Sequence, residues 1–93
     1  MDQIDLAIRR RRLRNRCRYR GFLEADLLLE RFAEAWLDRL EGERLDRLEA
    51  LLEESDQDIW DWVTGRRPVP ARHAGEVMGL LRRFAQGGGA ALA

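Results

Sequence analysis

Apolar residues recur at steps of three and four along most of this chain, and no segment alternates with a period of two. The clearest stretch is residues 22–40. Its apolar positions are Ala25, Leu28, Leu29, Phe32, Trp36 and Leu40. This spacing places apolar side chains on one stripe of an α-helix, whereas a half-buried strand needs strict alternation. The sequence therefore predicts an all-α protein with no sheet.

Glycine and proline divide the chain into five helical lengths. We expect helices at residues 5–18, 22–40, 43–54, 55–64 and 71–86. Ser55, with Asp58 three residues later, is a capping-box variant that marks the start of the fourth helix. The segment 66–70 cannot be helical, because each proline biases the residue before it toward extended geometry. Since 93 residues suffice for one small domain, we predict a single-domain five-helix bundle over residues 1–86, with a flexible Gly/Ala tail at residues 87–93.

Charge is strongly segregated, although the formal net charge is zero. Residues 1–20 hold eight Arg and two Asp (+6), residues 21–61 hold four Arg and fourteen acidic residues (−10), and residues 62–93 hold five Arg and one Glu (+4). The run Arg9–Arg12 could grip phosphates or an anionic surface, or it could be a solvated basic helix face. A single cysteine fits a reducing compartment, and no apolar run is long enough to span a membrane. We therefore expect a cytoplasmic protein.

Few residues could carry catalysis or hold a metal. One histidine and one cysteine, His73 and Cys17, make no ligand cluster. We expect His73 to be a partly exposed surface residue, and Cys17 has arginine neighbours that favour a thiolate but no base nearby. The glycine run 87–89 precedes no helix or lysine, so it is not a phosphate loop. Of Trp60 and Trp62, one should pack inward and the other lie at the surface. We expect no catalytic residue and no metal.

The segment Arg20-Gly21-Phe22-Leu23-Glu24 lies where the arginine-rich first helix gives way to the acidic second one. Between two helices, Gly21 can take a backbone conformation closed to other residues and lets a partner approach closely. Glu24 falls in the first turn of the second helix, where the helix dipole favours its charge. Arg20 and Glu24 would then project beside a bare patch. The residues alone leave a second interpretation equally open, a glycine hinge with an exposed Arg20–Glu24 ion pair.

This segment and its surroundings resemble the SdhE family of FAD assembly factors. The resemblance rests on Arg20-Gly21-x-x-Glu24, on Asp26-Leu27-Leu28-Leu29 with an aromatic at Phe32, and on the segment from Asp56 to Trp62. It implies an all-helical, five-helix protein that binds the flavoprotein subunit of succinate dehydrogenase, or of the related fumarate reductase. Such a protein promotes covalent attachment of FAD to that subunit. FAD is then handled by the client, and no cofactor is bound stably by the factor.

The functional motif of that family falls on Arg20, Gly21 and Glu24 of this chain. We expect flanking contacts from Arg14, Arg18, Tyr19 and Asp26. A factor of this kind is not an enzyme, because the chemistry of flavin attachment belongs to flavin and client. A second hypothesis, from another class, is a nucleic-acid-binding or regulatory module that uses the arginine-rich first helix. Acidic residues on the second helix would repel nucleic acid, so we expect no nucleic-acid partner.

Overall fold

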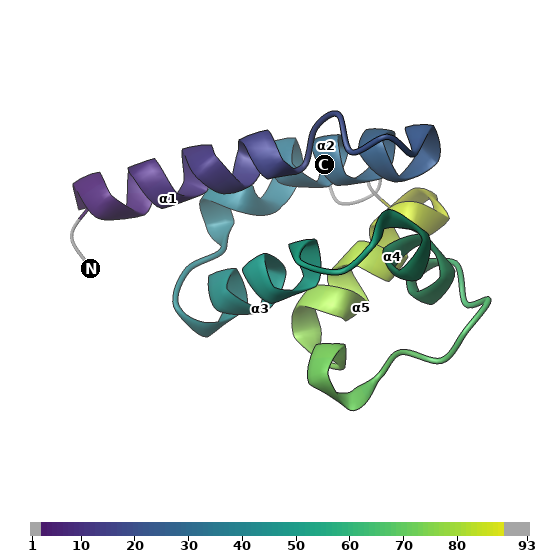
Figure 1. Ribbon diagram of the computed structural model, residues 1–93. Helices are drawn as coiled ribbons and strands as arrows, with labels where there is room; N and C mark the ends of the chain where they lie inside the picture. Colours follow the sequence, from purple (N-terminus) through teal and green to yellow (C-terminus); the bar gives the residue numbers. More distant parts are fainter. Residues whose placement is uncertain (1–2, 89–93) are drawn as a thin grey trace.

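The computed structural model describes residues 3–88, which form five α-helices and no strand. The helices are α1 (Gln3–Arg16), α2 (Leu23–Trp36), α3 (Glu43–Leu52), α4 (Asp56–Val63) and α5 (Glu76–Arg83). In Figure 1, α1 and α2 run along one side of the molecule, and α3, α4 and α5 lie beneath them. Contacts between α2 and α4, between α3 and α5, and between α4 and α5 close the bundle. The predicted all-α five-helix architecture is confirmed.

The apolar stripes that the sequence predicted form one continuous core. The buried residues of α2 are Ala25, Leu28, Leu29, Phe32 and Ala33, and those of α3 are Leu45, Leu48, Leu51 and Leu52. The ring of Phe32 is fully buried and meets Phe84 edge to face, with ring centroids 5.8 Å apart. Trp62 is buried and Trp60 is half-buried, as expected for two aromatics two residues apart on a helix.

Helix α1 is attached to the bundle largely through its arginines. Leu13 is the only residue of this helix that is fully buried. Arg9 forms ion pairs with Asp46 at 2.7 Å and with Glu49 at 2.6 Å, both on α3. Arg10 donates to two backbone carbonyls in the turn that follows α2, at 3.2 and 2.9 Å. Half of the predicted basic run Arg9–Arg12 therefore binds other parts of the protein.

The predicted fifth helix, residues 71–86, is wrong as a continuous element. Ala71–His73 (η2) forms a separate 3₁₀ turn, and α5 begins only after Gly75, whose φ is +144°. Since that backbone conformation is accessible mainly to glycine, the chain breaks there instead of passing through as a helix. After α5, the chain continues into Phe84–Gly88 (η3), within which Gln86 (φ −83°, ψ 17°) and Gly87 (φ +89°, ψ 0°) depart from helical geometry. The second helix is also shorter than predicted, because a 3₁₀ turn, Leu37–Arg39 (η1), follows its end at Trp36.

The start of α4 follows the sequence signal in part. The hydroxyl of Ser55 accepts a hydrogen bond from the backbone N–H of Asp58 at 3.2 Å, as in a capping box. The Asp58 carboxylate does not complete the box, since it binds the guanidinium of Arg67 in the extended segment that follows α4. Within residues 3–88, no helix combines the length and the apolar character needed to cross a membrane. Residues 89–93 of the predicted tail lie outside the described residues, so its flexibility stays a prediction.

Candidate functional site

The loop between α1 and α2 has an unusual backbone that exposes Gly21. Both Tyr19 (φ +53°) and Gly21 (φ +95°) lie in the left-handed region, as predicted for a glycine between two helices. A Cβ atom added at Gly21 would meet no heavy atom within 4 Å. The side chain of Tyr19 is 93% exposed. The loop therefore presents bare backbone and an exposed aromatic ring to solvent.

Two side chains hold the loop from the α2 side and the α4 side. The Asp26 carboxylate accepts hydrogen bonds from the backbone N–H groups of Arg20, at 2.7 Å, and Gly21, at 3.4 Å. The ring of Phe22 lies against Trp60 of α4, with centroids 5.9 Å apart. Asp26, which the sequence suggested as a flanking contact, thus shapes the loop from within. Its two hydrogen bonds fix the direction in which Gly21 faces.

Arg20 points into the protein, which corrects the expectation that it projects beside Gly21. Its guanidinium forms an ion pair with Asp56, the first residue of α4. It also donates to the carbonyl oxygens of Arg16 at 3.0 Å, Leu52 at 3.1 Å and Glu54 at 3.0 Å. Carbonyls at the ends of α1 and α3 lack partners within their own helices, and five fixed N–H donors suit them well. Arg20 therefore ties the loop to the α3–α4 junction.

Glu24 is left on the outer surface of the first turn of α2. The Arg20–Glu24 ion pair of the hinge interpretation is not formed, because Arg20 reaches Asp56 instead. In the part of the chain that the structure describes, Glu24 is exposed and takes part in no ion pair. Gly21 and Glu24 are the two motif residues that a partner can reach. Asp56, which completes the arrangement from the other side, was not among the predicted site residues.

The remaining arginines of the first helix and loop are mostly bound within the chain. Arg14 pairs with Asp38 at 3.4 Å, and Arg16 pairs with Glu53 at 2.8 Å. Arg18 lies 3.8 Å from Glu30 of α2. Within residues 3–88, Arg11 and Arg12 are exposed and form no ion pair. The two predicted flanking contacts Arg14 and Arg18 therefore lie beside carboxylates of the same chain, although the buried Nε atom of Arg18 makes no hydrogen bond. Little of the +6 charge is free to bind phosphates.

His73 is buried, so the expectation of a partly exposed surface residue is wrong. Its side chain is 5% exposed, its ring lies 5.3 Å from that of Trp62, and Nε2 is 2.5 Å from the Glu54 carboxylate. The hydrogen bond with His73, followed by that with Arg72, holds the pKa of Glu54 below its ordinary value. The backbone carbonyl of Glu54 accepts from Arg20. Glu54 thus connects the motif loop with the turn before α5.

Catalytic and metal chemistry find little support in the described residues. Cys17 is fully buried, and desolvation raises the pKa of its thiol to about 11, so the adjacent arginines do not produce a reactive thiolate. Residues 3–88 contain no group of three or more His, Cys, Asp or Glu side chains that could hold a metal ion. The arrangement around Gly21 can position a partner, but it offers no nucleophile with a base beside it.

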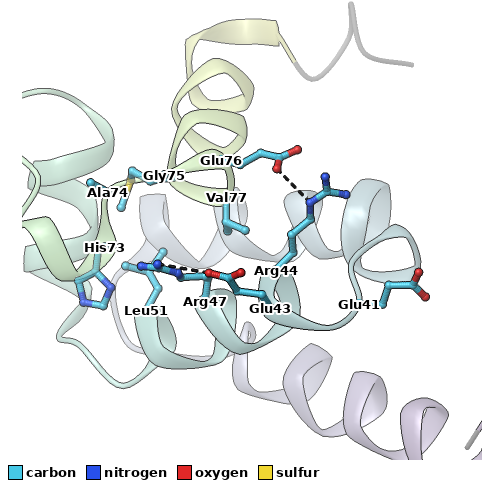
Figure 2. A pocket seen from close by; sticks show the side chains of 11 residues that line it. Glu41, Glu43, Arg44, Arg47, Leu51, His73, Ala74, Gly75, Glu76 and Val77 are labelled. Carbon is cyan, nitrogen blue, oxygen red and sulfur yellow. Dashed lines mark hydrogen bonds and ion pairs between the residues drawn. The ribbon is translucent and has the colours of Figure 1, made fainter. Parts of the chain in front are cut away.

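A cavity of about 520 Å³ opens between α3 and the start of α5, lined by residues of both (Figure 2). Its arginines are already engaged, since Arg44 donates to Glu76 at 3.0 Å and Arg47 pairs with Glu43 at 3.5 Å. Glu41 adds a further negative charge at the rim. The cavity does not include the motif loop.

Comparisons with known proteins identify the family of this chain. Residues 11–85 match the family described as the flavinator of succinate dehydrogenase. The FAD assembly factor SdhE of Acetobacter pasteurianus is 40% identical over 82 residues, which cover 88% of this chain and 72% of that protein. Mitochondrial succinate dehydrogenase assembly factor 2 of Mycosarcoma maydis is 49% identical over 63 residues (68% of this chain, 26% of that protein), and its counterpart in Danio rerio is 38% identical over 81 residues (85% and 51%). The chain thus spans about half or less of these two mitochondrial relatives. It belongs to the family of flavinators of succinate dehydrogenase, as its resemblance to the SdhE family indicated.

Proposed function

We propose that this protein is an assembly factor that binds the flavoprotein subunit of succinate dehydrogenase and promotes covalent attachment of FAD to it. The observation that carries the proposal is the bare surface at Gly21, held by hydrogen bonds to Asp26, with Glu24 beside it. Arg20 and Asp26 fix the loop from within, so Gly21 faces solvent, and a Cβ atom placed there would have no heavy atom within 4 Å. We infer the client, the flavoprotein subunit, from the family to which the chain belongs.

The protein would act by positioning and not by catalysis. Covalent attachment of FAD is chemistry of the flavin and of the client residue that receives it. Holding the reacting groups in the correct geometry can accelerate such a step substantially without any nucleophile from the factor. Gly21 would allow close approach of the client backbone, and Glu24 would orient against a client group beside the flavin. We propose that FAD stays with the client. In support, three glutamates line the cavity between α3 and α5, and its two arginines pair with two of them.

Several features support this proposal over a nucleic-acid-binding module. Most arginines of the first helix are engaged with carboxylates or carbonyls of the same chain, which leaves a smaller phosphate-binding surface than the sequence suggested. The exposed face of α2 carries two glutamates, Glu24 and Glu34, against one arginine, Arg31. We set the function in the cytoplasm, the compartment expected from a single buried cysteine and consistent with a bacterial relative. The flavoprotein of fumarate reductase is proposed as a second client.

The test is reconstitution with the purified apo-flavoprotein subunit of succinate dehydrogenase and FAD, with and without this protein. Covalent flavin is measured by fluorescence of the subunit in a denaturing gel. We expect the protein to increase covalent flavin at limiting FAD, and a parallel reaction with the fumarate reductase flavoprotein tests the second client. Equal covalent flavin with and without the protein would refute the proposal. Steep loss of DNA binding with rising salt would instead favour the nucleic-acid module.

A further inference from the structure

Large apolar side chains that remain exposed gather beside the motif. Within residues 3–88, the exposed fractions are 93% for Tyr19, 68% for Leu23 and 44% for Leu27. The only other exposed large apolar residues in this part of the chain are Ile4 (72%) and Ile8 (50%), near the start of α1. Single exposed apolar residues are common on protein surfaces, whereas a group of them marks an interaction site. Three such residues within nine positions indicate an interaction site.

Two of these three residues share one face of α2, and the third belongs to the motif loop. Leu23 and Leu27 are four residues apart on α2, so they are neighbours on one face of the helix. Tyr19 belongs to the loop that Asp26 binds to the start of α2. Glu24 follows Leu23 directly in the first turn. The apolar group therefore continues the surface formed by Gly21 and Glu24.

The backbone of Tyr19 gives a second, independent indication. A non-glycine residue at φ +53° is unfavourable, and a bulky aromatic is not among the residues that tolerate it well. Tyr19 contributes little packing energy that would offset this strain, because it is 93% exposed. Strain of this kind persists where the surrounding structure enforces it, and it is concentrated at functional sites. The ring is thus held out where a partner can bury it.

The charges on this surface identify the type of partner. Glu24 is exposed and takes part in no ion pair among the described residues, and Arg31 lies exposed on the same helix, four residues after Leu27. A surface with an apolar hollow and a basic group at its edge complements Leu23, Leu27 and Glu24 together.

We propose that Tyr19, Leu23 and Leu27 form the apolar anchor of the client interface. They enter an apolar hollow on the flavoprotein, and a basic group at the edge of that hollow receives Glu24. This proposal rests on the proposed function, because the flavoprotein subunit is the partner. It adds that affinity comes chiefly from these three side chains, while Gly21 and Glu24 set the approach and the orientation. Large aromatic and aliphatic anchors at the centre of an interface usually dominate its binding energy.

The test measures affinity of the full chain for the purified flavoprotein subunit by biolayer interferometry. The double variant Leu23→Ser/Leu27→Ser should raise Kd at least about tenfold, because two apolar side chains lose their burial. Ile4→Ser/Ile8→Ser is a matched control with closely similar exposure, and its Kd should stay within about twofold of wild type. Circular dichroism melts should be unchanged in both. Tyr19→Asn should also weaken binding without lowering the melting temperature, because asparagine tolerates a positive φ.

The outcomes separate this inference from the proposed function. If wild type binds the flavoprotein and the Leu23→Ser/Leu27→Ser variant binds equally well, the anchor is wrong and the proposed function stands. If wild type does not bind, the proposed function fails, and the anchor fails with it. Equal weakening by the Ile4→Ser/Ile8→Ser control also overturns the anchor. Sedimentation velocity could also overturn the anchor, by showing a wild-type dimer that the Leu23→Ser/Leu27→Ser variant abolishes while its affinity for the client is unchanged. The partner of this surface is then a second copy of the chain.

Discussion

Removing the guanidinium of Arg20 tests whether this residue supports the motif from within. In the structure, the side chain of Arg20 is 14% exposed and that of its partner Asp56 is 17% exposed. The Arg20→Ala variant leaves a largely buried carboxylate without its cation, together with three carbonyls that lose a donor. Breaking a buried ion pair by removing one partner costs about 3–5 kcal/mol, and partial exposure here favours the lower end, about 3 kcal/mol.

This loss is measurable by thermal unfolding followed with circular dichroism. For a domain of this size, 1 kcal/mol shifts Tm by about 4–8 °C, so Arg20→Ala should lower Tm by at least roughly 12 °C. Arg20→Lys should be destabilised as well, because one ammonium group cannot reach the same set of acceptors. Arg11→Ala is the control, since Arg11 is exposed without an ion pair and its loss should change stability by no more than about 0.5 kcal/mol. An Arg20→Ala variant as stable as Arg11→Ala would refute the inward clamp and restore an outward-facing role.

Gly21→Arg should lower the free energy of unfolding by about 1–2 kcal/mol, because a side chain is unfavourable at φ +95°, and it should abolish flavinylation. Gly42→Arg, also at a positive φ, should be destabilised yet retain activity in the same assay. The lowered pKa of Glu54 means that its charge stabilises the fold above about pH 4.5 and ceases to do so as pH falls through the lowered pKa. Thermal melts should therefore show Glu54→Gln below wild type near neutral pH, with the gap closing in acid, and a constant gap would count against this. Substituting glutamine at Arg11 and Arg12 should slow association with the flavoprotein and reduce its salt dependence without changing Tm, as stopped-flow rates across a salt series would test.

The periodic parts of the fold could be predicted from the sequence, because an apolar stripe at helical spacing has few ways to be buried. The position and positive φ of Gly21 could also be predicted, since a glycine between two helical patterns has that use. The burial of His73 in the turn before α5 could not, because it depends on Glu54, which is far away in sequence. A lone histidine carries no local signal of such a partner.

The inward direction of the Arg20 side chain could not be predicted from the sequence either. Local spacing favours Glu24, four residues away, as its partner, whereas the folded chain supplies Asp56 and the carbonyls at two helix ends. The arginine run of α1 was misleading for the same reason. Its charge looks free in the sequence, but Arg9 meets carboxylates on α3 only after the bundle forms. Long-range polar contacts of this kind have no periodic signature.

Covalent flavin formed with a Glu24→Ala variant tests the central claim most directly, because Glu24 is the exposed charged residue of the motif and has no structural partner in the described chain. Glu34→Ala, an exposed glutamate on the same helix, is the matched control. The purified flavoprotein subunit is incubated with FAD and each protein, and covalent flavin is read as in-gel fluorescence beside a melt of the same sample. We predict that Glu24→Ala melts within about 1 kcal/mol of wild type and yields little covalent flavin, while Glu34→Ala keeps full activity. Wild-type levels of covalent flavin with a folded Glu24→Ala variant would contradict the account.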